Sequence, residues 1–216
     1  MDSSTRMLIL VAILAVIWLA TVIFKRLRYR RLEYLIAQED LGPFLKLVDA
    51  LSTRLLFPEY NLTYMKLNGY LMHSDDEHAA ELFDKLLARK LNKRQRTDLV
   101  LKAFNFFVGI NNKQRAKELL TEIDAYDEAF ERAQLECHQM YDVIISKKSN
   151  HITEMEEELK HAGRMRRGQL AFLLALQYDY RGDRKRSESY LSQAKDDYGV
   201  SAAAEPRRAE DGDSAR

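Results

Sequence analysis

The sequence predicts an all-α protein in which a single N-terminal transmembrane helix precedes a domain of helix-turn-helix pairs. Residues 7–24 are 18 consecutive uncharged and almost wholly apolar side chains. The 216 residues include only three prolines and eight glycines. Apolar residues recur at spacings of three and four, which is the period of an α-helix, and no useful length shows the period of two that a β-strand requires.

The apolar run at residues 7–24 has the length of a membrane span. At a rise of 1.5 Å per residue it would extend roughly 27 Å, against a hydrocarbon core of about 30 Å. The alternative is a cleaved secretory signal, which would leave an exported domain. Such a signal needs charges before a shorter apolar core and a small-x-small cleavage site after it. Only Arg6 precedes the run and Lys25-Arg26 follows it, which favours a retained anchor.

The charges that flank the run predict its orientation. Residues 1–6 carry Asp2 and Arg6, whereas residues 25–31 carry five basic side chains and no acid. Because basic flanks stay in the cytoplasm, we expect a short non-cytoplasmic N-terminus at 1–6 and a cytoplasmic domain on a single-pass cell-membrane protein. The basic juxtamembrane segment 25–31 would face anionic lipid head groups through Lys25, Arg26, Arg28, Arg30 and Arg31.

The composition of the remaining chain excludes some classes of function. Residues 32–216 contain 28 basic and 32 acidic side chains, a net charge of −4, which argues against binding of nucleic acid. The single cysteine, Cys137, agrees with a reducing compartment. Residues 201–216 lack large apolar side chains and are predicted to form a disordered tail.

The helices of the domain are predicted in pairs. A degenerate leading pair, 32–38 and 44–56, falls within residues 32–58, between Gly42-Pro43 and Pro58. Four more pairs fill residues 59–200, with first helices at 62–72, 99–108, 130–145 and 170–180, and second helices at 79–88, 115–123, 152–159 and 187–194. Ser74 and Glu77 predict a capping box before the first of these second helices. Aligning the second helices places Ala79, Ala116, Ile152 and Ser187 in register, at separations of 37, 36 and 35 residues.

A helix-turn-helix unit with this period indicates a repeat solenoid. The residues that occupy equivalent positions are Leu174-Ala175, Tyr178, Gly182-Asp183, Ser187, Leu191 and Ala194 in the fourth copy, Tyr70, Ala79, Phe83 and Leu86 in the first, and Phe104, Phe107, Ala116, Leu120 and Ile123 in the second. They resemble the tetratricopeptide-repeat family. The third copy departs most, with Met140, Val143, Ile152 and Glu156, and no copy has the family's usual proline at the repeat end.

The resemblance implies an α-solenoid of four to five repeats whose first helices line a concave groove for a partner peptide or helix. The groove positions carried over from the family are Asn61, Tyr64, Asn68, Asp98, Leu101, Asn105, Gln134, Cys137, Tyr141, Gln169, Phe172 and Leu176. The amides of Asn68 and Asn105 would hydrogen-bond a ligand backbone. The family's carboxylate-clamp lysines and arginines are missing, so an aromatic-amide groove is favoured. Tyr64, Tyr141 and Phe172 could instead be core side chains, and Cys137 a small buried apolar residue.

These features favour a membrane-anchored scaffold or adaptor for protein–protein interaction, with a homo-oligomer possible. The alternative is a chaperone-like receptor, or holdase, for unfolded or nascent clients near a translocon. The cluster from His73 to His78 invites a metal hypothesis, but a helix cap explains its acids. The sequence lacks phosphate-loop, G-x-S-x-G and C-x-x-C motifs, so we expect no enzyme, cofactor or metal. The charge runs 154–158 and 164–167 predict solvated faces.

Overall fold

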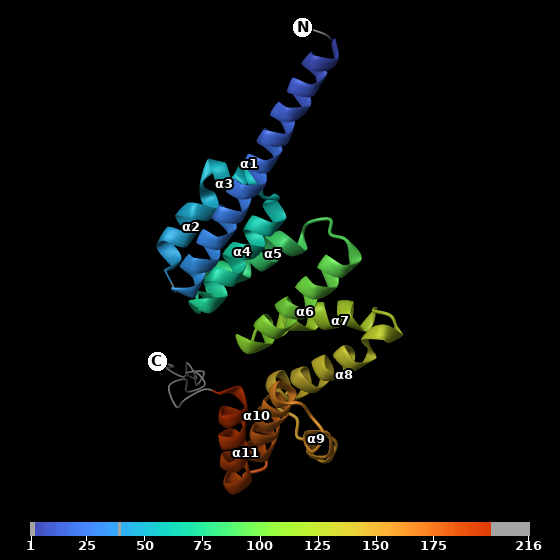
Figure 1. Ribbon diagram of the computed structural model, residues 1–216. Coiled ribbons are helices and arrows are strands. Elements are labelled where there is room, and N and C mark those ends of the chain that lie inside the picture. Colours follow the sequence, from blue (N-terminus) through green and yellow to red (C-terminus); the bar gives the residue numbers. More distant parts are fainter. Residues whose placement is uncertain (1–2, 39, 200–216) are drawn as a thin grey trace, which may run out of the picture. The chain divides into compact units, whose positions relative to one another are not determined.

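The chain folds entirely into helices wherever its structure is described. A computed structural model describes the backbone of residues 3–38 and 40–199, and their side chains apart from residues 3–6 and 8–10. Every regular element in this part of the chain is helical (Figure 1), so the predicted all-α class is confirmed. Residues 1–2, and the tail predicted at 201–216, lie outside the described residues.

The elements follow one another with short connections. In chain order they are α1 (Ser3–Ala37), α2 (Leu41–Asp49), α3 (Leu51–Leu56), α4 (Glu59–Met72), α5 (Asp76–Leu87), α6 (Lys93–Gly109), α7 (Lys113–Asp124), the 3₁₀ turn η1 (Glu128–Phe130), α8 (Glu131–Met140), the π-helical turn η2 (Tyr141–Ile145), α9 (Ile152–Leu159), α10 (Arg164–Tyr180) and α11 (Arg184–Tyr198). Two compact units divide the chain, residues 1–99 and 100–216, so helix α6 begins in one unit and ends in the other.

Helix α1 is continuous through three segments that the sequence analysis treated separately. The apolar run 7–24, the basic segment 25–31 and the expected helix 32–38 join in one helix, because neither glycine nor proline occurs between Ser3 and Ala37. Its N-terminal half extends away from the other helices of the first unit (Figure 1), and the side chains of residues 11–27 are exposed. Among the side chains that the structure describes, no helix is long and apolar enough to cross a membrane.

The C-terminal end of α1 belongs to the core of the first unit. Leu32 and Leu35 are buried in a cluster with Phe44 and Val48 of α2 and Leu62 of α4. Helix α2 packs against both α1 and α4. The same helix therefore carries the apolar run and part of the domain core.

The prediction of one helix at 44–56 is wrong in one respect, because the helix is broken at Ala50. The ψ angle of Ala50 is 135°, which ends α2 and starts α3. The carbonyl of Ala50 accepts the N–H of Thr53 at 2.8 Å. The Thr53 hydroxyl also donates to the carbonyl of Leu47 at 2.7 Å. These bonds occupy backbone groups near the break and stabilise the bend.

Three of the helix pairs share one turn geometry. The residue before each second-helix cap has a positive φ: 53° at Ser74, 56° at Asn111 and 76° at Gly182. The following residue donates its N–H to the carbonyl five positions earlier, at 3.0, 2.8 and 2.9 Å for Asp75, Asn112 and Asp183. This is the bond that closes a helix ending in a left-handed residue.

The residue after each positive φ caps the second helix. The side chains of Asp75, Asn112 and Asp183 accept from the backbone N–H three positions later, at 3.2, 3.1 and 3.1 Å. The capping box expected at Ser74 is therefore wrong, and Asp75 is the cap of α5. A left-handed backbone at Ser74 closes the preceding helix instead. Small polar residues suit both positions for different reasons.

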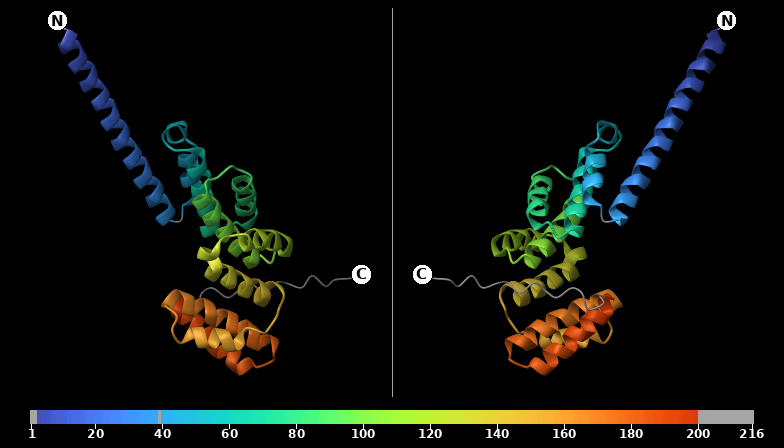
Figure 2. Two further views of the ribbon diagram at one scale, coloured as in Figure 1. Left: turned by 90° about the vertical axis from the view of Figure 1, so that its right-hand side faces the viewer. Right: turned by 90° about the vertical axis from the view of Figure 1, so that its left-hand side faces the viewer.

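The pair that includes α9 departs from this pattern, as its sequence indicated. Helix α8 runs into the π-helical turn η2, and Lys147, in the following loop, has a φ of 53°. Val143 of η2 and Met155 of α9 are buried with Leu170 and Leu174 of α10. Helices α10 and α11 lie side by side in both views of Figure 2 and pack closely. A Cβ on Gly168 would come within 3.2 Å of the Asp197 Cβ, so a larger residue there would push the two helices slightly apart.

Replacement of Asn112 by alanine is expected to lower the free energy of unfolding by about 1 kcal/mol, because α7 would lose its N-cap acceptor. For a chain of this size the loss corresponds to a midpoint about 2–4 °C lower, measurable by circular dichroism of the full-length protein in detergent. Asn111→Gly is the matched control. It keeps the turn and relieves a left-handed residue, so it should leave the midpoint unchanged or higher.

Candidate functional site

The second unit contains an open concavity of about 460 Å³. Four helices and the π-helical turn contribute to its walls. The lining residues are Asn105 from α6, Arg132, Glu136 and Met140 from α8, Ile144 from η2, Met165, Arg166, Gln169, Phe172 and Leu173 from α10, and Tyr198 from α11. The concavity is therefore formed mainly by α8 and α10, and α6, the first helix of the preceding pair, contributes Asn105. We call this surface the second-unit groove.

One arginine ties together the helices around the second-unit groove. Arg166 donates from Nε and Nη2 to the two carboxylate oxygens of Glu158 on α9, at 2.9 and 3.0 Å. It also donates to Gln139 of α8 and to Gln169 one turn further along α10, each at 3.0 Å. Glu136 of α8 lies 3.6 Å from the same guanidinium. The Arg166 side chain is 12% exposed, so these bonds are made with little competition from water.

The charges beside the groove are paired rather than solvated. The runs 154–158 and 164–167 are predicted to be solvated faces, and the ion pair between Glu158 and Arg166 shows that this is wrong for these two residues. Hydrogen bonding to Arg166 is the main cause that holds the pKa of Glu158 below its ordinary value of 4.5. Burial acts in the opposite direction, and the charges of Arg166 and Arg132 lower the pKa further. Glu158 is therefore stabilised as a carboxylate.

Part of the groove lining is apolar and includes two methionines, Met140 and Met165. Met140, Ile144 and Phe172 are partly buried against the core formed by α9 and α10. Met165 is 69% exposed at the start of α10. The Gln169 amide donates to the Met140 sulfur at 3.1 Å, which holds both side chains in the wall. Flexible thioether and aromatic side chains make a surface that fits apolar partners of varied shape.

Three of the twelve predicted groove residues line this surface, namely Asn105, Gln169 and Phe172. Asn105 is exposed, whereas Gln169 and Phe172 are half-buried. Each lies on a first helix of its pair, which is where the repeat register placed it. The structure brings these three together in one concavity of the second unit.

Two of the predicted groove residues, Gln134 and Cys137 of α8, do not line the second-unit groove. The Gln134 amide donates to backbone carbonyls at the end of α7, at 3.0 Å to Ile123 and 3.1 Å to Tyr126. It therefore closes the preceding helix. Cys137 is buried, and burial is the main cause that raises the pKa of its thiol to about 12. A thiol in that state is a poor nucleophile.

Two predicted residues of the first unit contact one another. The Tyr64 hydroxyl donates to the Asp98 carboxylate at 3.0 Å. Burial, and then this hydrogen bond, raise the pKa of Tyr64 to about 12. The ring of Tyr60 stacks on Tyr64 with centroids 5.9 Å apart. These aromatic rings lie outside the second-unit groove.

The remaining predicted groove residues lie outside the second-unit groove as well. Asn61 is exposed, and Asn68, Leu101, Tyr141 and Leu176 are half-buried. Leu176 packs against the core of α9 and α10.

The sequence did not predict the charged wall of the groove, which consists of Arg132, Glu136 and Arg166, because amides and aromatic residues at a fixed register were expected there. The arginine run 164–167 was the available signal, since an arginine next to a buried helix face often pairs with a carboxylate.

The histidine cluster forms a local network around the start of α5. His78 Nδ1 lies 2.9 Å from each carboxylate oxygen of Asp75, and its ring stacks on Tyr70 with centroids 4.8 Å apart. The hydrogen bond between the two raises the pKa of His78 and lowers that of Asp75. His73 Nδ1 lies 2.9 Å from the Gly69 carbonyl. Within the described residues no group of three or more His, Cys, Asp or Glu side chains could hold a metal ion.

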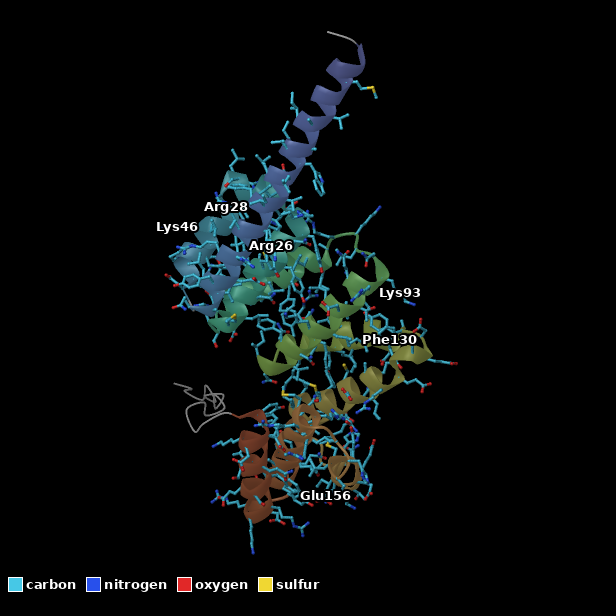
Figure 3. All side chains as sticks on the ribbon, in the orientation of Figure 1. Arg26, Arg28, Lys46, Lys93, Phe130 and Glu156 are labelled. Atoms are coloured by element: carbon cyan, nitrogen blue, oxygen red, sulfur yellow. The ribbon has the colours of Figure 1, made fainter. Side chains whose placement is uncertain are left out.

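The basic residues after the apolar run lie on α1, and several contact neighbouring side chains. Lys25 lies 5.3 Å from the ring centre of Phe57. Arg28 lies over Phe24 and donates to the Ser52 hydroxyl at 2.9 Å. Arg26, Arg30 and Arg31 are exposed. Figure 3 labels Arg26 and Arg28 on α1 and Lys46 on the neighbouring α2.

Comparison with known proteins identifies no relative of the chain. No protein-family model matches it, and no curated protein or solved structure is significantly similar to it.

Removal of the Glu158 carboxylate by Glu158→Gln is expected to destabilise the protein at neutral pH. The folded-state pKa lies below the ordinary 4.5, so the unfolded chain binds a proton first as pH falls. The contribution of the Glu158 carboxylate to the free energy of unfolding is therefore complete above pH 4.5, and it is lost as pH falls through the folded-state pKa. Thermal midpoints of wild type and variant should differ at pH 7 and converge in acid.

Glu188→Gln, on the exposed face of α11, is the control for loss of one negative charge. Its midpoint should stay close to that of wild type at pH 7. A constant gap between wild type and Glu158→Gln from pH 7 down to pH 3 would contradict the assignment to Arg166.

Proposed function

We propose that this protein is a membrane-tethered adaptor, built as a tetratricopeptide-like solenoid, that binds a partner segment in the second-unit groove. The observation that carries this function is the convergence of three first helices, α6, α8 and α10, on one concave surface. Two of the residues expected there from the repeat register, Asn105 and Gln169, are polar amides beside an apolar floor. That combination suits an extended peptide or amphipathic helix.

The recurring turn supports the repeat interpretation. Ser74, Asn111 and Gly182 have the same left-handed backbone, and the residue after each caps a helix in the same way. The caps Asp75 and Asn112 are 37 residues apart, which is close to the period of tetratricopeptide repeats. Each such pair has little core of its own, so neighbouring pairs would bury one another's apolar faces.

The chemistry of the groove indicates what the partner presents. Met140, Met165 and Phe172 offer an apolar floor, and their contacts would bury apolar side chains of the ligand. Asn105 is exposed, and its amide can donate to and accept from a ligand backbone, whereas the Gln169 amide is engaged by Arg166 and Met140. Arg132 is 76% exposed at the rim but already pairs with Glu136 at 3.1 Å and lies 3.6 Å from Glu158, so its charge does not call for an acidic residue in the partner. A catalytic role is not part of this proposal.

The tether rests on residues 7–24 and their flank. The full sequence has 18 uncharged residues there, and the described side chains of 11–24 are exposed on a continuous helix. Exposure of such a run to water is unfavourable, because transfer of each CH₂ group from water into an apolar environment gains about 0.8 kcal/mol. The basic segment 25–31 favours an outward N-terminus and a cytoplasmic domain. The tether would raise the local concentration of the groove near membrane partners.

Met165→Glu is expected to reduce recovery of the partner about tenfold or more, equivalent to 1.4 kcal/mol or more of binding free energy. A carboxylate would enter the apolar floor without a change in the core, since Met165 is 69% exposed. Full-length protein would be purified from gently solubilised membranes and its partners identified by mass spectrometry. Asn105→Ala should weaken the same interaction by removing a groove amide.

Leu135→Glu is the matched control, because Leu135 is 46% exposed on α8 but does not line the groove. One or two proteins retained by the control and lost from Met165→Glu would support a selective adaptor. Equal recovery with both variants would refute the groove as the binding surface.

A holdase for unfolded or nascent clients is the second candidate, and Met140 and Met165 are the observation that favours it. Methionine adapts to many apolar shapes, as promiscuous binding surfaces require. A holdase would recover a broad set of clients with exposed apolar segments and suppress their aggregation in vitro. The adaptor would do neither.

The double substitution Ile13→Arg, Ile17→Arg is expected to release the protein from alkali-washed membranes. Each arginine near the centre of a span costs about 2.5–3.5 kcal/mol of insertion free energy. The fraction in the membrane pellet would be measured by immunoblot, with Leu135→Arg as the control for an added surface charge. Retention of the double variant in the pellet would contradict a tether at residues 7–24.

A further inference from the structure

The short helix α3 has the reverse of the pattern expected for a helix on a soluble domain. Thr53 is fully buried, whereas Leu51 is 72% and Leu55 79% exposed. The two leucines are four residues apart, so they lie on the same face, one turn from each other. Among the described residues they are the most exposed large apolar side chains. Buried polar and exposed apolar side chains on one helix indicate that something covers the apolar face.

The inversion is fixed by the fold of the first unit. The extended backbone at Ala50 turns the chain between α2 and α3. The hydroxyl of Thr53 then reaches the carbonyl of Leu47 at 2.7 Å, which directs residue 53 inward. Residues 51 and 55, two positions to either side, are directed outward on the opposite face. Rotation of α3 to bury the leucines would break the Thr53 hydrogen bond.

Contacts with α1 place α3 at the end of the apolar run. Lys25 lies over Phe57, just after α3, and Arg28 donates to Ser52 within α3. Figure 1 shows α3 beside α1 where α1 leaves the other helices. Lys25 and Arg28 follow Phe24 by one and four residues, which is at most about 6 Å along a helix. The head-group region on each side of a bilayer is about 5–8 Å thick.

We propose that α3 is a second membrane contact, in which Leu51 and Leu55 enter the head-group region of the bilayer that holds residues 7–24. This proposal rests on the proposed tether. The charges agree with an anionic lipid surface, because α3 has no acidic residue and Arg54 is exposed between the two leucines. Long basic side chains reach the phosphates while neighbouring leucines lie deeper.

The contact would fix the domain against the membrane. Helix α1 is unbroken, so a span at 7–24 alone would leave the first unit free to rotate about the helix axis. A second contact beside that axis removes this freedom. The first unit would then present one defined face to the cytoplasm. Neither α1 nor α3 contains a glycine or proline that would act as a hinge.

The test is an environment-sensitive fluorophore on Leu55→Cys in the full chain, in a Cys137→Ala background, reconstituted into phosphatidylcholine–phosphatidylglycerol vesicles. We expect the label at position 55 to emit at a shorter wavelength than the free fluorophore does in buffer. We also expect its emission to be quenched by lipids that carry a nitroxide near the head group. Glu33→Cys, exposed on α1, is the matched control. It lies about 14 Å beyond Phe24 along the helix and should be quenched far less.

Vesicle flotation separates the possible failures. If the protein does not float with the vesicles, both the tether and this proposal are overturned. If it floats but the label at 55 behaves like the label at 33, the tether stands and the second contact is overturned. A blue shift that depends on protein density and not on nitroxide lipid would assign the leucines to a second copy of the chain, which also overturns the proposal.

Discussion

The second-unit groove depends on the hydrogen bonds of Arg166. Its guanidinium joins α8, α9 and α10 through Gln139, Glu158 and Gln169. These helices surround the part of the chain where the repeating turn is interrupted by the π-helical turn and the loop after it. Here the backbone is irregular, and Arg166 supplies side-chain hydrogen bonds between the helices. A planar group with five donors can connect acceptors in several directions at once.

The same arrangement pairs the charge of Arg166 within the groove wall. Arg166 lines the concavity and donates to the Glu158 carboxylate and to the side chains of Gln139 and Gln169. The apolar side chains Met140 and Phe172 therefore share the wall with a charge that already has its partner. Breaking a partly buried pair costs more than forming it gains, because the remaining charge is left without its partner. The network therefore favours one arrangement of the wall.

Continuity of α1 is the second constraint with functional consequences. A flexible linker between tether and domain would let the domain sample many orientations, whereas an unbroken helix transmits orientation directly. Because Leu32 and Leu35 of that helix are buried among α2 and α4, the domain cannot separate from it without loss of core. If residues 7–24 are the proposed tether, the first unit would follow that helix without a flexible joint.

The spacing of apolar residues by itself determined the helices, since helical period is a local property. It anticipated α4, α5, α7, α9 and α11 and the aberrant third pair, whereas α6 and α10 begin at Lys93 and Arg164, before the predicted 99 and 170. The caps were less secure: Ser74 and Asp75 both suit a helix start, and only the backbone decides which one is left-handed. Register alone placed Asn105, Gln169 and Phe172 on first helices, and the structure finds them lining one concavity, while their contact with a partner stays a prediction. Only the tertiary structure decided the partners of Arg166 and the outward face of α3, because both depend on segments brought together by packing rather than by sequence spacing.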